Sequence, residues 1–168
     1  MVRWVRAAAL LALISGMAGC GQAARTSDAT TAAQALLAAV QTGDAKAFEA
    51  RLDRPALRAD LRGQLQAVAQ ANGLDVAGGA ADFTLDRMIA PEAFHLVRSQ
   101  DGAALTTPPT VAQVAALMTP VAKDRACLHD LAAPQRCLLT FARGDAGWRL
   151  VAMPASDLRI VVPPEPKA

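Results

Sequence analysis

The chain has 168 residues but no tyrosine, and its only other aromatic residues are four phenylalanines and two tryptophans. Histidine is also scarce, with His95 and His129 alone. Tyrosine and histidine supply much of the acid–base chemistry of enzymes. Their scarcity leaves carboxylates as the main candidates for any proton transfer.

Familiar catalytic motifs are missing as well. The sequence contains no Gly-x-Ser-x-Gly elbow, no His-Glu-x-x-His, no phosphate-binding loop and no dinucleotide fingerprint. These absences argue against the common serine hydrolases, zinc peptidases and nucleotide-binding enzymes. We therefore expect neither a cofactor nor a bound metal.

Long hydrophobic runs are absent too. The longest uncharged N-terminal stretch, from Ala7 to Cys20, has 14 residues, whereas a membrane-spanning helix needs roughly 20. Arg3 and Arg6 precede this stretch, and small residues end it. A basic start, a short apolar run and small residues are typical of a secretory signal, which we place at residues 1–19. A retained transmembrane anchor is the weaker alternative.

The end of this segment, Met17-Ala18-Gly19-Cys20, resembles the lipobox of bacterial lipoproteins. The resemblance implies cleavage before Cys20, a diacylglyceryl thioether on its thiol and acylation of the new amine. The alternative is an ordinary secretory signal in which Cys20 is incidental. The resemblance also implies a bacterial cell envelope location facing the periplasm. Gly21, where an aspartate would favour the inner membrane, favours the outer membrane.

Cleavage would leave 149 residues, enough for one domain with a sizeable core. We predict a lipidated tether at 20–29, a single domain at 30–162 and a proline-rich tail at 163–168. Loss of the two N-terminal arginines removes the net charge of +2 and leaves 15 basic and 15 acidic side chains. A neutral chain of this kind gives no indication of nucleic-acid binding.

After lipidation of Cys20, the cysteines left are Cys127 and Cys137. An even pair in an oxidising compartment predicts a disulfide. The alternatives are a redox pair or half of a zinc site. The spacing is not Cys-x-x-Cys, and His129 alone cannot complete four zinc ligands.

Helical patterns fill the first two thirds of the sequence. Apolar spacing predicts a helix over 30–41, and Asp44 and Asp53 are placed to cap the next two, of which the longer ends at Asn72-Gly73. Shorter helices are expected around Asp82 to Ile89, around Phe94-His95-Leu96, and from Val111 to a stop at Pro120.

Strand patterns dominate the rest of the chain. We predict strands around Cys127, over 137–143 and over 148–153, with Trp148 in the core and a hairpin turn at Gly144-Asp145-Ala146-Gly147. Residues 158–162 are predicted to add an edge strand. Helices followed by a meander predict an α+β fold, with N-terminal helices packed on a small C-terminal antiparallel sheet.

The segment from Asp53 to Leu65, with Asp-x-Pro-Ala-Leu-Arg at its start, resembles an uncharacterised bacterial family, a domain of unknown function. The resemblance covers about residues 32–115 and implies no activity. The closing Gly-x-x-Gly-Trp-Arg-Leu-Val pattern, from Gly144 to Val151, loosely resembles the last hairpin of cystatin-like or nuclear-transport-factor-like folds.

Charged residues are the remaining candidates for chemistry or ligand contact. Asp82 and Asp86 lie four apart, on one face of an expected helix, and Arg58 and Arg62 form a similar stripe. Such carboxylates serve acid–base chemistry only when their environments separate their pKa values. A solvated face with local ion pairs is the plainer interpretation, and the arginines could instead clamp an anionic group.

We therefore expect a membrane-anchored, non-enzymatic envelope lipoprotein that binds an envelope protein, a lipid or a small apolar ligand. A small hydrolase or isomerase, using Asp82, Asp86 or Asp130 with His129, is the alternative from another class. A structural partner in an envelope assembly is the third.

Overall fold

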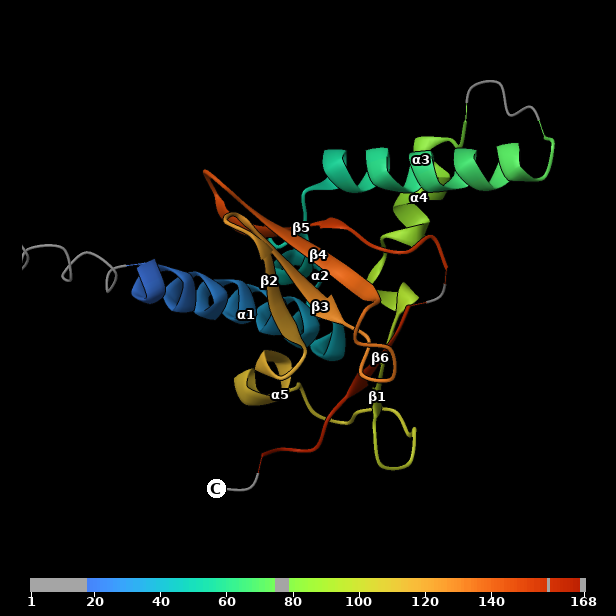
Figure 1. The fold of residues 1–168 in the computed structure, drawn as a ribbon. Helices are drawn as coiled ribbons and strands as arrows, with labels where there is room; N and C mark the ends of the chain where they lie inside the picture. Colours follow the sequence, from blue (N-terminus) through green and yellow to red (C-terminus); the bar gives the residue numbers. More distant parts are fainter. Residues whose placement is uncertain (1–17, 75–78, 157, 167–168) are drawn as a thin grey trace, which may run out of the picture.

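The computed structural model describes residues 18–74, 79–156 and 158–166, with side chains described from residue 26 onward. It is an α+β domain in which helices pack on a small antiparallel sheet, as expected (Figure 1). The helices are α1 (Ala18–Thr42), α2 (Ala45–Glu49), α3 (Arg54–Ala71), α4 (Asp82–Met88), the 3-10 helix η1 (Pro91–Ala93) and α5 (Val111–Ala115). The strands are β1 (Phe94–Arg98), β2 (Met118–Ala122), β3 (Arg125–His129), β4 (Cys137–Gly144), β5 (Gly147–Ala152) and β6 (Leu158–Val162).

The main sheet has the order β2-β3-β4-β5, and every neighbouring pair is antiparallel. Helix α1 contacts all four strands and so covers one face of the sheet. Side chains with no exposed surface from the helix and the sheet meet between them, among them Leu36, Leu37, Leu139 and Leu150. Burial of this apolar surface is the main force that holds helix and sheet together.

Helix α1 begins at Ala18, well before the predicted start at residue 30. Its backbone therefore continues through the predicted tether, and Ala29 is fully buried in the core. The Thr30 hydroxyl donates to the carbonyl oxygen of Thr26 one turn earlier, at 2.8 Å, which allows this polar side chain to be buried. The polar composition of residues 21–28 does not indicate the helix that their backbone forms.

Residues 1–17, which hold most of the predicted signal peptide, lie outside the described residues, as does the side chain of Cys20. Among the helices that the structure describes, none combines the length and apolarity needed to cross a bilayer.

The caps of the next two helices are confirmed. A side-chain oxygen of Asp44 accepts the N–H of Ala47 at 2.9 Å, and one of Asp53 accepts the N–H of Ala56 at 3.1 Å. Helix α3 ends at Ala71, and Gly73 follows with a φ of 69°, a left-handed conformation that glycine adopts easily. These ends depend only on neighbouring residues, so local sequence suffices to predict them.

The start of α3 is joined to the edge of the main sheet. The N–H of Asp53 donates to the carbonyl oxygen of Leu150, and the N–H of Leu150 donates to that of Arg51, both at 2.9 Å. Further along α3, the side-chain amide of Gln64 donates to the carbonyl oxygen of Met153 at 2.8 Å. The first half of α3 is thereby held against β5 and the chain that follows it.

The hairpin of β4 and β5 turns at Gly144 to Gly147, as predicted. Strand β2 was missed, because Pro120 was expected to end a helix. Instead α5 ends at Ala115, and Pro120 lies within β2 at the edge of the sheet. An edge strand tolerates proline because one side of its backbone has no strand to bond.

The expected helix around His95 is also wrong. Residues 94–98 form β1, in which Phe94 and Leu96 are buried while His95 is exposed, the alternation of a strand. Strand β6 lies parallel to β1, with Leu96 opposite Ile160, and is not the predicted edge of the main sheet. This pairing joins segments more than 60 residues apart, so no local pattern reveals it.

Candidate functional site

The four charged residues singled out from the sequence lie together, between α3 and α4. Arg54, Arg58 and Arg62 recur every four residues along one face of α3, and Asp82 and Asp86 do the same on α4. Glu49 of α2 completes the group. We call these six residues the ion cluster, which comprises Glu49, Arg54, Arg58, Arg62, Asp82 and Asp86.

Arg58 and Asp86 form the centre of the ion cluster. The Arg58 guanidinium donates from Nε to Oδ1 of Asp86 at 2.8 Å and from Nη2 to Oδ2 at 2.6 Å. Two parallel bonds of this kind match the planar fork of arginine to the carboxylate. Nη1 of Arg54 donates to the same Oδ1 at 3.0 Å, so that Asp86 binds two arginines.

The outer pairs extend the ion cluster in both directions. Nη2 of Arg62 donates to Oδ1 of Asp82 at 2.6 Å, and Nη1 of Arg58 lies 3.6 Å from Oδ2 of Asp82. Nε of Arg54 donates to Oε2 of Glu49 at 2.7 Å, and its Nη2 pairs with Oε1. Three acids face three arginines, so the cluster has no net formal charge.

The hydrogen bond from Arg58 holds the pKa of the Asp86 carboxyl below its usual range. The bond from Arg54 does the same for the pKa of Glu49. Both acids therefore stay ionised at neutral pH, which suits ion pairing and not proton donation. The clearest consequence of the arrangement is mechanical: the cluster fastens α4 to α3.

The histidines do not join the acids proposed for catalysis. Both ring nitrogens of half-buried His129 are shielded from solvent and lack a hydrogen-bond partner in the described part of the chain. Oδ1 of Asp130 accepts the N–H of Ala132 at 3.0 Å, and its Oδ2 lies 3.7 Å from Nη1 of Arg136. No hydrogen bond joins His129 to Asp130. Within the described ranges, no three His, Cys, Asp or Glu residues are grouped so as to hold a metal ion.

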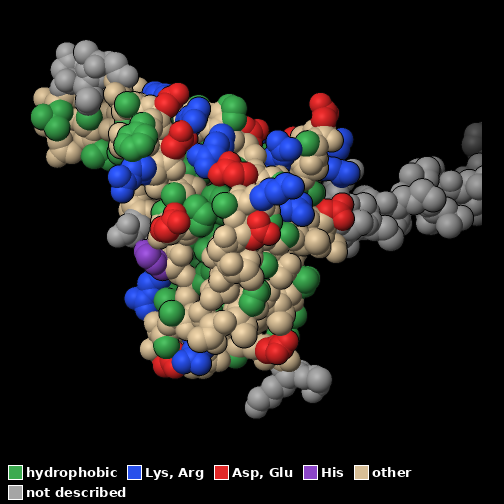
Figure 2. All heavy atoms as spheres, turned by 180° about the vertical axis from the view of Figure 1, so that it is seen from behind, with side chains coloured by type: hydrophobic (Ala, Val, Ile, Leu, Met, Phe, Trp, Pro, Cys, Tyr) green, Lys and Arg blue, Asp and Glu red, His purple; other side chains and the backbone are tan. Residues whose placement is uncertain are grey.

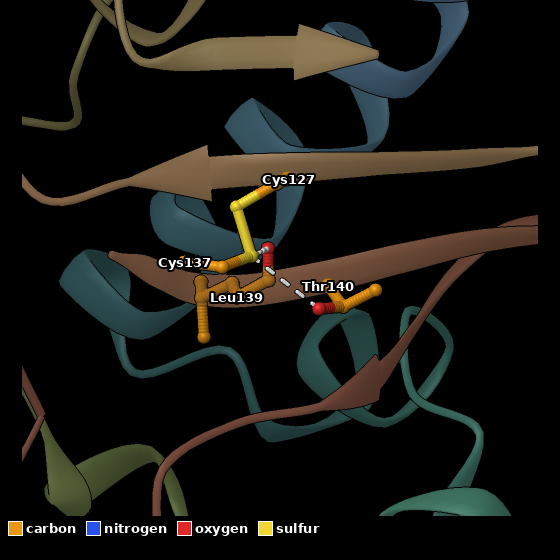
Figure 3. The surroundings of a disulfide bond; sticks show 4 residues. All are labelled: Cys127, Cys137, Leu139 and Thr140. Carbon is orange, nitrogen blue, oxygen red and sulfur yellow. Dashed lines mark hydrogen bonds between the residues drawn. A yellow bond between two sulfur atoms is a disulfide. The ribbon is translucent and has the colours of Figure 1, made fainter. Parts of the chain in front are cut away.

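Cys127 and Cys137 form the predicted disulfide, which links β3 to β4 (Figure 3). Cys127 is fully buried and Cys137 is exposed at the start of its strand. The sulfur of Cys137 lies 3.4 Å from the Thr140 hydroxyl, and all four residues drawn belong to this one hairpin. The bond therefore links the two strands of the β3–β4 hairpin covalently.

Three large apolar side chains on or next to α3 and α4 are exposed, a feature that the sequence pattern did not reveal. Val68, Leu74 and Phe83 are 60%, 63% and 73% exposed. We call these three residues the apolar tip. In Figure 1 the second half of α3 projects beyond the sheet, and Figure 2 shows apolar side chains gathered on this projecting arm. The spacing of Val68 continues that of the buried Leu57 and Leu61, yet its side chain is exposed.

A family model described as "Protein of unknown function (DUF2939)" matches residues 20–120. The matched segment contains α1 from its third residue, the other helices that the structure describes and β1. It ends within β2, so most of the main sheet lies outside it. No curated protein and no solved structure matches the chain. The likeness to cystatin-like or nuclear-transport-factor-like folds remains a prediction.

Proposed function

The chain belongs to the DUF2939 family of proteins of unknown function, and we propose that it is a lipid-anchored, non-enzymatic interaction module of the bacterial envelope. Cys20 attaches it to the membrane, the outer membrane in a cell that has one, and the domain faces the periplasm. The apolar tip is the surface that it presents to an envelope protein. No activity follows from family membership, so the proposal is argued from the chain itself.

The anchor is supported by the lipobox-like ending at Cys20, which is also where the family match begins. Two or three acyl chains would hold the protein stably, whereas a single chain binds only marginally. Helix α1 leads from this cysteine to the core without a break, and Ala29 is already buried. The domain would therefore be held close to the membrane surface.

The observation that carries the interaction role is the exposure of the apolar tip. Large apolar side chains gathered on a projecting surface mark contact sites more often than scattered ones do. The ion cluster supports this arm, because it fastens α4, which contains Phe83, to α3, which contains Val68. Figure 1 shows the arm on the side of the molecule opposite the start of α1, so a partner would meet it away from the anchor.

A photo-crosslinking amino acid at Phe83 tests the contact in intact cells. We expect one discrete adduct, lost when Val68→Asp and Leu74→Asp are introduced together. The control places the same amino acid at Val111, which is 49% exposed on α5. Absence of an adduct at Phe83, or an equal adduct at Val111, contradicts the proposed surface.

Metabolic labelling with an alkyne fatty acid tests the anchor separately. We expect the wild-type chain to be labelled and Cys20→Ser to be unlabelled and released from the membrane fraction. Undiminished labelling of Cys20→Ser contradicts the anchor site.

A further inference from the structure

The turn between β2 and β3 lies beside the beginning of α1. Thr26 of α1 lines one surface hollow together with Val121, Lys123 and Arg125 of this turn. The hollow has a volume of about 300 Å³, and Trp148 forms part of its wall. Figure 1 shows that α1 begins on the side toward which the β2–β3 and β4–β5 turns point. The two hairpin turns and the start of α1 thus share one end of the molecule.

This end carries basic side chains without partners. Lys123, Arg125 and Arg143 are exposed, and none of them forms an ion pair within the described part of the chain. The arginines of the ion cluster, by contrast, are all paired. The backbone holds the basic residues together, since the N–H of Arg143 donates to the carbonyl oxygen of Asp124 at 2.9 Å.

Asp124 and Asp145 are the acids of the same turns, and they leave the three basic residues in slight excess. An apolar group accompanies this excess charge, since Val121 is 55% exposed at the rim of the hollow. An exposed apolar side chain among unpaired cations is suited to the boundary between lipid headgroups and water.

The wall of the hollow adds a polar feature. The indole N–H of Trp148 has no hydrogen-bond partner in the described residues, although the side chain is only 7% exposed. Buried indole N–H groups usually bind an acceptor.

The short distance between the hollow and Cys20 favours a membrane surface as its binding partner. Cys20 precedes Thr26 by six residues on α1, which is about 9 Å along the helix axis. The headgroup layer of a bilayer is of comparable thickness, roughly 5–8 Å. If Cys20 is lipidated, the β2–β3 turn is therefore held within reach of the membrane surface.

We propose that the β2–β3 turn rests on anionic phospholipid headgroups of the membrane that holds the anchor. Val121 enters the interface, while Lys123, Arg125 and Arg143 lie over the phosphates. The inference rests on the proposed lipidation of Cys20. A tether this short gives the turn a high effective concentration at the membrane, so a weak contact suffices. The contact fixes the orientation of the domain and directs the apolar tip away from the bilayer.

The test uses the full lipid-modified chain, reconstituted in vesicles, with Val121→Cys as the labelling site. Lipidation of Cys20 and the Cys127–Cys137 disulfide leave this thiol as the one free for an environment-sensitive fluorophore. Vesicles of phosphatidylethanolamine and phosphatidylglycerol, doped with a headgroup spin label, are compared with similarly doped phosphatidylcholine vesicles. We expect a blue-shifted emission and strong quenching in the anionic vesicles only.

The matched control is Phe83→Cys, an exposed apolar position at the opposite end of the molecule, which we expect to show neither change. Replacing Lys123 and Arg125 with glutamate should reduce the quenching at residue 121, because each basic side chain lost near an anionic surface weakens docking roughly fivefold. A second label at Ala122→Cys, an exposed neighbour in the same hollow, provides the same measurement with all three basic residues intact if the first variant folds poorly.

Flotation of the vesicles separates the two proposals. A chain that does not float with vesicles lacks the anchor, and its failure overturns the proposed attachment. A chain that floats but shows no quenching at residues 121 and 122, or equal quenching in both kinds of vesicle, overturns the headgroup contact while the anchor stands.

Discussion

Arg58 of α3 donates hydrogen bonds to both carboxylate oxygens of Asp86 of α4, although the two residues are 28 positions apart in the sequence. The chain between them includes residues 75–78, which lie outside the described part of the structure. The pair is one of several that hold α4 on α3, together with Arg54–Asp86 and Arg62–Asp82. Because Phe83 lies between Asp82 and Asp86, the same pair also positions the apolar tip.

Replacing Asp86 with asparagine should destabilise the protein in a pH-dependent way. The pKa of Asp86 is lowered in the folded state, so its ion pairs stabilise the fold above the unfolded pKa and are lost as the pH falls through the folded one. We expect Asp86→Asn to lower the urea midpoint at pH 7. The difference from wild type should narrow as the pH falls below about 4, where an unfolded aspartate becomes protonated.

Urea titrations followed by circular dichroism at pH 7 and at lower pH give this comparison. Asp28→Asn serves as the control, because Asp28 is exposed on α1 and forms no ion pair in the described chain. If the urea midpoint of Asp86→Asn is lower than that of the wild type by the same amount at every pH, the loss of stability is not due to the ion pairs.

Replacement with alanine should destabilise the protein strongly at one phenylalanine and hardly at all at another. Phe48 is fully buried, and its ring meets that of Phe94 edge to face with centroids 5.4 Å apart. We expect Phe48→Ala to lower the free energy of unfolding by about 3–5 kcal/mol. Phe83 is 73% exposed, so Phe83→Ala should change it by no more than about 0.5 kcal/mol. Chemical denaturation measures the free energy of unfolding of both variants. A large decrease in Phe83→Ala would show that the apolar tip is part of the core.

The cap of α3 should contribute measurably to stability. Asp53 accepts the N–H of Ala56, and loss of such a cap costs about 1 kcal/mol. Asp53→Ala should therefore lower the thermal midpoint. Asp53→Asn keeps an accepting oxygen, so its thermal midpoint should stay close to that of the wild type. An equal decrease in both variants would indicate that the carboxylate charge, and not the cap, provides the stability.

The disulfide should stabilise the β3–β4 hairpin by restricting the unfolded chain. Its cysteines are 10 residues apart, and closing a loop of that size contributes roughly 3 kcal/mol on the chain-entropy model. We expect replacement of Cys127 and Cys137 with serine, together, to lower the thermal midpoint by several degrees. Thiol titration of the denatured, unreduced wild type should find no free thiol from this pair. Two free thiols there would rule the bond out.

Much of the fold was predictable from short stretches of sequence. The caps at Asp44 and Asp53, the stop at Gly73 and the turn before Gly147 each depend on residues a few positions apart. The errors arose where distant segments decide the outcome. His95 lies in a strand because residues 158–162 pair beside it, and Pro120 is accommodated in β2 because that strand lies at a sheet edge.

The sequence by itself determined the residue types on which the candidate sites depend. These are two helical stripes whose charged residues recur every four positions, a cysteine pair, and a lipobox-like ending before the domain. Only the tertiary structure decided what the stripes meet, since the hydrogen bonds between Arg58 and Asp86 require α3 and α4 to be folded against each other. It also decided that Val68 is exposed and that Lys123 and Arg125 of the β2–β3 turn lie beside α1. Periodicity indicates which side chains share a face of a helix, but packing alone determines whether that face is covered.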